Sequence, residues 1–417
     1  MTNALASAPW LCAMARVFAD TPLYLVGGAV RNPLMGLPLS DIDVCGPALP
    51  AQVCALCEGT PVRAVMRAAH FGTVELHLRD DTGARHMAEY TTWREDSYRC
   101  GHRPDSVRFT RDIRVDALRR DFSVNALYRR VLPDGLGDVI DPTGGLAHLQ
   151  KGVLHTVCAD PDRVLGEDGL RILRAARFEA ELDLRPTPAL LESLRRNAPL
   201  LRDIARERLR DEWQKTLLAD LRYPGLRRRA PGSATGLATL ADCGAWPYLA
   251  GGLAYDQPAA RALGRFSRPD LASRLALLFR AAAPERLEQT LLGMRFSVRD
   301  AALAARYVAA LHLPDGQPFA WARLGEDALD FAIAAFAALG DEAGSARAAR
   351  AARSLAGKPL SLRELALNGE DLKPLFAQRG IPLRRMGELL AALWRAAVEG
   401  EAENTREGLM EWIKKQG

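Results

Sequence analysis

Long hydrophobic runs are absent from this sequence of 417 residues. No stretch approaches the roughly 20 consecutive apolar residues that a membrane-spanning helix requires. The beginning, MTNALASAPWLCAMARVFAD, also lacks the basic start and the small-residue cleavage site of a secretory signal. We therefore expect a cytoplasmic protein with no membrane segment.

Cysteine is scarce as well, with seven residues, an odd number that follows no framework spacing. This pattern excludes a disulfide-stabilised scaffold and is typical of reduced thiols in a reducing compartment. Cys54 and Cys57 form a C-x-x-C pair, but neither a second pair nor histidines follow at the spacing of zinc ligands. The favoured interpretation is two small apolar residues on a helix, and the role of the pair stays open.

Lysine is rare among the charged residues. Only six of the 56 basic residues are lysine, which leaves 50 arginines. The codon usage of a GC-rich genome explains most of such an excess, so basic clusters are more informative than the total. The formal net charge of +5 mildly favours a polyanionic partner.

The two ends of the chain differ in their hydrophobic pattern. Short β-rich runs between turns fill the first 150 residues, whereas Leu/Ala/Arg segments with helical spacing dominate from Pro161 onward. A chain of this length exceeds one hydrophobic core. We therefore predict an α+β protein, with a small mixed sheet and helices at the front and an all-helical remainder. Breaks rich in Gly, Pro and Ser at residues 227–236, 312–318 and 354–361 are candidate joints.

The stretch LYLVGGAVRN, followed by SDIDV, is the first motif with a chemical meaning. LYLV predicts a strand, Gly27 and Gly28 a turn, and AVRN the start of a helix, whose backbone N–H groups and positive dipole end suit a phosphate. Arg31 adds a charged donor. Asp41 and Asp43 lie at i and i+2 of the next strand and so on one face, where two carboxylates could hold two divalent ions about 4 Å apart. A surface turn and a solvated strand end are the alternative.

Five segments in this order resemble the motifs of the nucleotidyltransferase superfamily typified by DNA polymerase β, in the form of bacterial class II tRNA nucleotidyltransferases and poly(A) polymerases. They are VGGAVRN to SDIDV, LRRDFSVNAL (118–127), DPTGGLAHLQKGVL (141–154), EDGLRILRAARF (167–178) and RERLRDEWQKTLL (206–218). The resemblance implies a polymerase β-like catalytic head (1–156), a helical neck that reads the base (157–222), a helical body (223–353) and a tRNA-binding helical tail (354–417). Asn32 departs from the family, which usually has aspartate there, and we expect that position to be structural.

Four polar residues outside the first motif receive roles from this resemblance. Glu89, in the strand-like run HMAEYTTW, is the candidate third carboxylate beside the aspartate pair, and an exposed strand carboxylate is the alternative. In LRRDFSVNAL the resemblance implies that Arg120 grips triphosphate oxygens, while Asp121 and Asn125 bind a ribose. Without the resemblance, Asp121 would be interpreted as a helix cap.

The segment EDGLRILRAARF predicts one helix. On it Asp168 and Arg171 lie three residues apart and share a face, and Arg174 and Arg177 continue a basic stripe. A carboxylate accepts from an exocyclic amine and a guanidinium donates to a ring nitrogen or carbonyl, which matches cytosine and adenine but not uracil and guanine. The resemblance implies that this pair reads the incoming base. An i, i+3 salt bridge on a solvated helix is the alternative.

Together the motifs predict a template-independent tRNA nucleotidyltransferase that adds C, C and A to the tRNA 3′ end from CTP and ATP, with two Mg²⁺ ions and release of pyrophosphate. The expected partners are the acceptor stem and 3′ end of tRNA and nucleoside triphosphates, with no stable protein partner. A poly(A) polymerase, an enzyme confined to CC or A addition, and a non-catalytic RNA-binding relative are the alternatives. Retention of both Asp41 and Asp43 argues against the last. The oligomeric state, the metal used in the cell and the tRNA contacts stay open.

The polar segment REDSYRCGHRPDSV (94–107) has too little apolar surface to pack firmly, and we expect a mobile loop. An untemplated enzyme must change its pocket from cytosine to the larger adenine after two additions. We expect this loop, with Arg99 and Arg103, to let Asp168 and Arg171 turn toward ATP. An exposed linker is the alternative.

Overall fold

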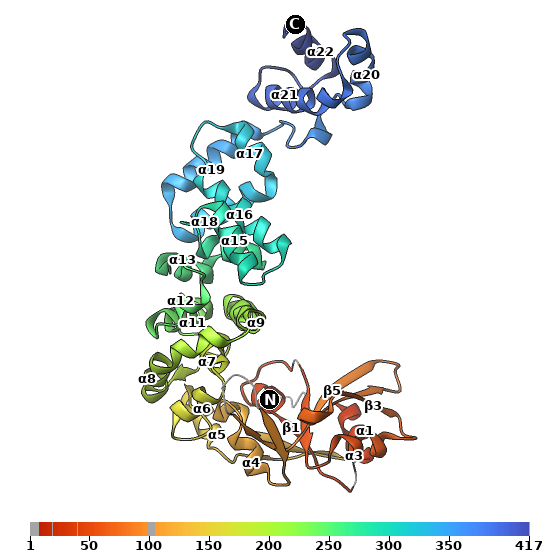
Figure 1. Ribbon diagram of the computed structural model, residues 1–417, viewed down its shortest axis with the longest axis vertical. Coiled ribbons are helices and arrows are strands. Elements are labelled where there is room, and N and C mark those ends of the chain that lie inside the picture. The colour runs from red at the N-terminus through yellow and green to blue at the C-terminus, as the bar shows by residue number, and fades with distance from the viewer. Residues whose placement is uncertain (1–7, 19, 40, 99–104, 417) are drawn as a thin grey trace. The chain divides into compact units, whose positions relative to one another are not determined.

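The computed structural model describes residues 8–18, 20–39, 41–98 and 105–416 (Figure 1). The chain forms two compact units, Met1–Leu249 and Ala250–Gly417. Within the described ranges, none of the helices is both long and apolar enough to cross a bilayer.

A seven-stranded mixed sheet forms the front part of the first unit, with the strand order β3-β4-β5-β2-β1-β8-β9 (Figure 1). Its strands are β1 (Leu23–Val26), β2 (Asp43–Gly46), β3 (Val62–Ala68), β4 (Thr73–Arg79), β5 (Arg85–Thr92), β8 (Tyr128–Leu132) and β9 (Gly135–Ile140). β2 is parallel to β5, and the other neighbouring strands are antiparallel. This sheet with its helices, followed by helices, confirms the predicted α+β class.

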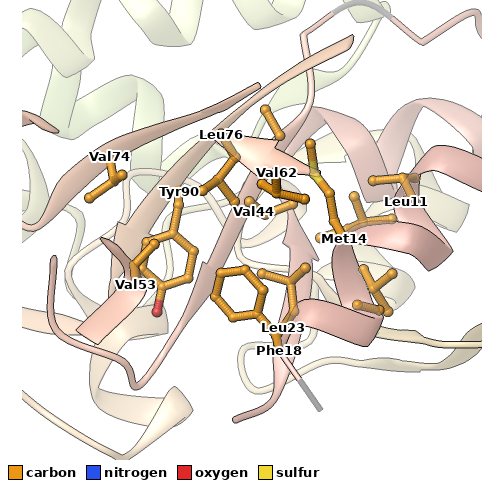
Figure 2. Packing of buried hydrophobic residues seen from close by; sticks show 14 of the residues in the cluster. Leu11, Met14, Phe18, Leu23, Val44, Val53, Val62, Val74, Leu76 and Tyr90 are labelled. Atoms are coloured by element: carbon orange, nitrogen blue, oxygen red, sulfur yellow. The ribbon is translucent and has the colours of Figure 1, made fainter. Parts of the chain in front are cut away.

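One face of the sheet carries the main hydrophobic core of the first unit (Figure 2). Helices α1 (Pro9–Val17) and α3 (Pro50–Cys57) contribute Leu11, Met14 and Val53 to this cluster. Each such buried side chain contributes about 1.5–3 kcal/mol to the stability of the fold. Val44 of β2 also enters the cluster, so its neighbour Asp43 points to the opposite face of the sheet.

A smaller hydrophobic cluster lies on that opposite face, over β1, β2 and β8. It joins Val26 and Tyr128 of these strands to Ala117 of α4 (Ile113–Leu118) and Val164 of α6 (Pro161–Glu167). The neighbouring strands β4 and β5 carry polar side chains on the same face, among them Glu75 and Glu89. The acidic motif therefore lies beside a packed region and next to a polar one.

The rest of the first unit is mostly helical. Its other elements are α2 (Gly28–Leu34), α5 (Gly145–Lys151), α7 (Leu170–Leu182), α8 (Pro188–Asn197), α9 (Arg206–Leu217), α10 (Ala219–Arg222), α11 (Gly232–Asp242), α12 (Trp246–Leu249), the pair β6 (Arg94–Ser97) and β7 (Ser106–Phe109), and the parallel pair β10 (Val153–Leu154) and β11 (Arg185–Pro186). Helix α11 packs directly on α7, since a Cβ on Gly232 would meet the Ala180 carbonyl oxygen at 2.0 Å. This close packing explains why the first unit continues past residue 222.

The second unit contains only helices among its described residues. They are α13 (Gln257–Ala262), α14 (Leu271–Leu278), α15 (Pro284–Gly293), α16 (Val298–His312), α17 (Pro318–Leu324), α18 (Glu326–Leu339), α19 (Glu342–Leu355), α20 (Gly369–Gln378), α21 (Met386–Glu399) and α22 (Arg406–Lys415), with short 3-10 turns between some of them. The last three share a hydrophobic cluster that extends from Leu365 to Ile413. Trp394 of α21 packs edge-on against Phe319 of α17, with ring centres 5.1 Å apart.

Candidate active site

The glycine turn connects the first strand to the helix that follows it. Gly27 has a φ of 64°, a conformation that favours glycine, and α2 begins at the next residue. The backbone N–H of Gly27 donates to the carbonyl of Leu127 at 3.2 Å, and a Cβ on Gly27 would lie 3.7 Å from the carbonyl oxygen of Asn125. The turn is therefore held against the segment that contains RRDFSVNAL.

Carboxylates from three neighbouring strands form a row on the sheet face opposite the Figure 2 cluster. Asp43, at the start of β2, is in register with Glu89 of β5, and Glu89 is opposite Glu75 of β4. Asp41, Asp43 and Glu89 are exposed. Partial desolvation and the charge of Asp41 raise the pKa of Asp43, and desolvation with the charges of Asp43 and Glu75 raises the pKa of Glu89. Such a row of like charges favours a bound cation.

Arg120 is the neighbouring charge that acts most strongly on Asp43, and it is itself fixed by two side chains. Its Nη2 lies 3.0 Å from Oδ2 of Asp116, and its Nε donates to the Oη of Tyr128 at 2.9 Å. Desolvation raises the pKa of Asp43, and among the neighbouring charges Arg120 opposes this rise most. Sequence reasoning missed Asp116, although its spacing of three and four residues from Arg119 and Arg120 is a visible helical signal.

A buried polar network connects three of the sequence motifs. Arg31 of α2 donates to Oδ1 of Asn125, whose Nδ2 donates to Oδ1 of Asp121 at 3.1 Å. Arg174 of α7 donates from Nε to Oδ2 of Asp121 at 2.7 Å. Burial alone would raise the pKa of Asp121, but the guanidinium groups of Arg174 and Arg171 hold it far below the usual value. Asp121 thus connects the segment RRDFSVNAL to α7 as an ionised carboxylate and is not a helix cap.

Asn32 occupies the position at which the sequence departs from the family. Its Oδ1 accepts from Nη2 of Arg31 at 2.8 Å, and its Nδ2 donates to the Oη of Tyr223 at 2.9 Å and to the carbonyl of Pro38 at 3.2 Å. The side chain is 1% exposed. It therefore orients Arg31 and ties α2 to the residue that follows α10, which is a structural role.

The segment predicted as one helix is divided at Asp168, so that expectation was wrong. Helix α6 ends at Glu167, Asp168 is extended with φ −146° and ψ 106°, and α7 begins at Leu170. Oδ1 of Asp168 accepts from the backbone N–H of Leu170 at 3.0 Å, and Oδ2 accepts from Nη2 of Arg208 at 2.7 Å. A Cβ on Gly169 would lie 2.9 Å from the Cβ of Leu200, so the break is also fixed by close packing.

Arg171 has its donors engaged inside the protein. Nη1 donates to the carbonyl of Val164 at 2.8 Å and to Oε2 of Glu167 at 2.7 Å, and Nη2 donates to the carbonyl of Arg119 at 2.6 Å. Its side chain is 7% exposed. Asp168 and Arg171 thus have separate partners and do not form the predicted alternative, a salt bridge on a solvated helix.

Two arginines of the basic stripe on α7 and Arg31 of α2 pack around one aromatic ring. The guanidinium carbons of Arg31, Arg174 and Arg177 lie 5.4, 5.3 and 4.5 Å from the centre of the Phe178 ring. Glu212 of α9 balances part of this charge, with its Oε2 2.9 Å from Nε of Arg177. Sequence reasoning did not single out Glu212, because its partner lies on another helix.

The segment predicted as a mobile loop contains a hairpin. β6 and β7 pair as antiparallel strands, and Asp96 of β6 contacts Arg94 at 2.7 Å and Arg119 at 3.6 Å. The expectation of a loop without firm packing was wrong for these two strands, because their backbones pair with each other and the contact of Asp96 with Arg119 ties β6 to the segment after α4. Arg99 and Arg103 lie outside the described residues.

The two cysteines of the C-x-x-C pair differ in their burial. Cys54 is half-buried, whereas Cys57 is buried on α3 in the sheet core. Burial raises the pKa of the Cys57 thiol to about 11, so this sulfur stays protonated near neutral pH.

Comparison with known proteins covers nearly the whole chain. Residues 23–155 match the family described as the poly A polymerase head domain, and residues 183–228 match a probable RNA and SrmB-binding site of polymerase A. A CCA-adding enzyme of Geobacillus stearothermophilus is 32% identical over 402 residues, which covers 94% of this chain and 92% of that relative. The crystal structure of Bacillus stearothermophilus CCA-adding enzyme in complex with CTP has a TM-score of 0.75 at 28% identity and covers 98% of both chains. Thermotoga maritima CCA-adding enzyme complexed with tRNA shares the fold, with a TM-score of 0.66 at 20% identity over 98% of this chain and 95% of that one.

Proposed function

This chain belongs to the family of CCA-adding enzymes, and we propose that the residues gathered around Asp41 and Asp43 are its active site. It is a nucleotidyltransferase that adds C, C and A to the 3′ end of tRNA without a nucleic-acid template. CTP and ATP are its substrates, tRNA is its macromolecular partner, and pyrophosphate is the leaving group.

One observation carries the site proposal: the sheet register brings Asp43 beside Glu89, and guanidinium groups from three different motifs act on the same place. Desolvation raises the pKa of Asp43, and the charges of Arg120, Arg174 and Arg31 oppose that rise. These guanidinium groups are held in place by Asp116, Asp121 and Asn125. A solvated strand end has no need of such an arrangement. An anionic substrate held beside bound cations does need it.

The residues present fit Mg²⁺. Asp41 and Asp43 offer only oxygen ligands, and the charge of Asp41 contributes to the raised pKa of Asp43 after desolvation. Among the described residues, no group of three or more His, Cys, Asp or Glu side chains is arranged to hold a metal ion. Mg²⁺ needs only one or two carboxylates from the protein and completes its shell with water and substrate phosphates. Asp41 and Asp43 would hold two ions, with Glu89 beside them. When bound, the ions would lower the pKa of the tRNA 3′ hydroxyl and neutralise charge at the phosphates.

The arginines have different tasks in this proposal. The tRNA 3′ oxygen forms a bond to the α-phosphorus while the bond to pyrophosphate breaks, and Arg120 binds triphosphate oxygens before and during this step alike. Arg31, expected from the sequence to donate to a phosphate, is 6% exposed and pairs with Asn125, so we infer instead that it shapes the ribose side of the pocket together with Asp121. Gly27 and Gly28 let the backbone of the turn approach the triphosphate.

Base selection is assigned to Asp168 and Arg171, whose donor and acceptor groups match cytosine and adenine. In this structure Asp168 is paired with Arg208 and Arg171 with Glu167 and two carbonyls. Reading a base therefore requires these side chains to exchange partners, and Arg174 and Arg177 keep the surrounding pocket positive.

The domain boundaries in this proposal follow from the family resemblance. We assign the head to 1–156, the neck to 157–222, the body to 223–353 and the tail to 354–417, with tRNA bound by body and tail. The separate hydrophobic cluster from Leu365 to Ile413 supports a distinct tail. A cytoplasmic location, where tRNA and nucleotides meet, belongs to the same proposal.

A direct assay tests the function and the site together. The protein is incubated with tRNA transcripts that lack CCA, CA or A, single nucleotides are offered, and the 3′ ends are sequenced. We expect C, C and A to be added and synthesis to stop there; continued A addition would indicate a poly(A) polymerase. Asp43→Asn should abolish incorporation and leave tRNA binding intact, whereas Glu75→Gln, on the same sheet face, should remain active. Normal turnover of Asp43→Asn would refute the site.

A further inference from the structure

Asp116 of α4 is a fully buried carboxylate with four donors around it. It is 0% exposed, and its oxygens accept from Nε of Arg119 at 2.7 Å, Nη2 of Arg120 at 3.0 Å and the Oη of Tyr128 at 2.7 Å. The backbone N–H of Arg94, at the start of β6, donates to it at 3.3 Å. One side chain thus contacts a helix, a sheet strand and the hairpin.

The charge of Asp116 is retained despite its burial. Burial alone would raise the pKa of Asp116, but Arg120, Arg119 and the hydrogen bond from Tyr128 lower it to about 2. Removing two charges from water costs about as much as their attraction returns, so a buried ion pair adds little stability compared with apolar residues of the same size. The consequence of this arrangement is geometric: it sets where two consecutive arginines point.

Both arginines interact with residues of the proposed nucleotide site. Arg120 is the neighbouring charge that most opposes the desolvation-driven rise in the pKa of Asp43. The carbonyl of Arg119 accepts from Nη2 of Arg171 at 2.6 Å, and the Arg119 side chain lies 3.6 Å from Asp96 of β6. Asp116 therefore anchors three parts at once: the proposed triphosphate side through Arg120, the proposed base side through Arg119, and the hairpin.

We propose that Asp116 is a positioning residue for the incoming nucleoside triphosphate: it holds Arg120 toward Asp43 and the Arg119 carbonyl beneath Arg171. The inference rests on the roles proposed above for Arg120 and Arg171. A purely structural carboxylate would affect folding but not nucleotide affinity, so the two interpretations differ in kinetics.

The test compares Asp116→Asn with a buried carboxylate that is remote from this network. Glu179→Gln is the control, since Glu179 is 8% exposed and hydrogen-bonded to Thr239 of α11. We expect Asp116→Asn to raise KM for both CTP and ATP by about tenfold, because the amide removes the charge that orients Arg120. The turnover number and tRNA affinity should stay within about twofold of wild type. Glu179→Gln should leave the nucleotide KM unchanged.

A double-mutant cycle identifies the route of the effect. In an Arg120→Ala background, Asp116→Asn should raise the nucleotide KM by clearly less than it does in wild type, because one of its two targets, the Arg120 side chain, is gone and only the Arg119 carbonyl remains. An unchanged KM in Asp116→Asn, or an effect that adds fully to that of Arg120→Ala, overturns the proposal. If Asp116→Asn does not fold, Tyr128→Phe removes one hydrogen bond from the same anchor and should raise the nucleotide KM by about threefold. An unchanged KM there also overturns it. Incorporation by Asp43→Asn would instead signal failure of the site assignment.

Discussion

Replacing Asp121 with asparagine should lower the free energy of unfolding of the first unit by about 2–3 kcal/mol. The amide keeps an oxygen for the backbone N–H of Phe122, 2.8 Å away, and for Nδ2 of Asn125 at 3.1 Å. In the wild type, Nε of Arg174 donates to Oδ2 of Asp121 at 2.7 Å. In the variant, the amide nitrogen takes the place of this oxygen and faces the guanidinium of Arg174. A charge-assisted bond is lost and two donors oppose each other. Because the Arg174 side chain is 31% exposed, water compensates in part, which keeps the loss below the roughly 3–5 kcal/mol of a fully buried pair.

The loss of stability caused by the same substitution should depend on pH. Burial alone would raise the pKa of Asp121, but Arg174 and Arg171 hold it far below that of a free carboxyl, so the folded state favours the ionised form. A depressed pKa contributes stability that is present above the unfolded value of about 3.9 and is lost as the pH falls below it. The difference between wild type and Asp121→Asn should therefore be constant from about pH 5 to 8 and shrink below about pH 4.

Urea unfolding, read from hydrogen exchange of amides in β1 and α7, reports on the first unit alone. Glu95→Gln is the matched control, because Glu95 forms a similar pair with Arg108 but the two side chains are 49% and 83% exposed. That control should lose no more than about 0.5 kcal/mol. If Asp121→Asn loses no more than Glu95→Gln, the buried network does not hold head and neck together and the reasoning fails.

Three further outcomes are expected. Asp168→Ala should weaken discrimination against UTP and GTP more than it weakens triphosphate affinity, measured as kcat/KM for each nucleotide; unchanged selectivity would remove Asp168 from base reading. Gly145→Ala should destabilise the first unit by more than about 3 kcal/mol in urea unfolding, because its Cβ would lie 2.2 Å from the Ser123 carbonyl oxygen; near-normal stability would contradict that contact. Shortening the segment between β6 and β7, or replacing Arg99 and Arg103 with alanine, should stop synthesis at CC, as read by sequencing tRNA ends; complete CCA at the normal rate would favour the linker interpretation.

Much of the site could be predicted from local pattern. The spacing of Asp41 and Asp43 correctly brings the two charges close together, although the strand begins only at Asp43 and Asp41 lies before it, contrary to the expectation that both lie on the strand. A glycine with positive φ at position 27 follows from a turn between strand and helix. The helix around 168–171 was predicted wrongly, because its break depends on contacts with Leu200 and Arg208, and a helical pattern contains no information about them. The hairpin arms were mistaken for a loop because backbone pairing and the contact of Asp96 with Arg119 hold them, and apolar periodicity detects neither.

The sequence by itself determined which chemical groups this protein has: two carboxylates spaced by one residue, a glycine turn, and an ordered set of motifs that identifies the family. The tertiary structure decided which of those groups remain available to a substrate. Arg31 and Asn125 are 94 residues apart in the chain yet bonded to each other, Arg171 is held by Glu167 and two carbonyls, and Asp116 orients Arg120. The physical reason is that motif spacing specifies which donors and acceptors exist. Burial and neighbours brought in by the fold specify which of them are already satisfied.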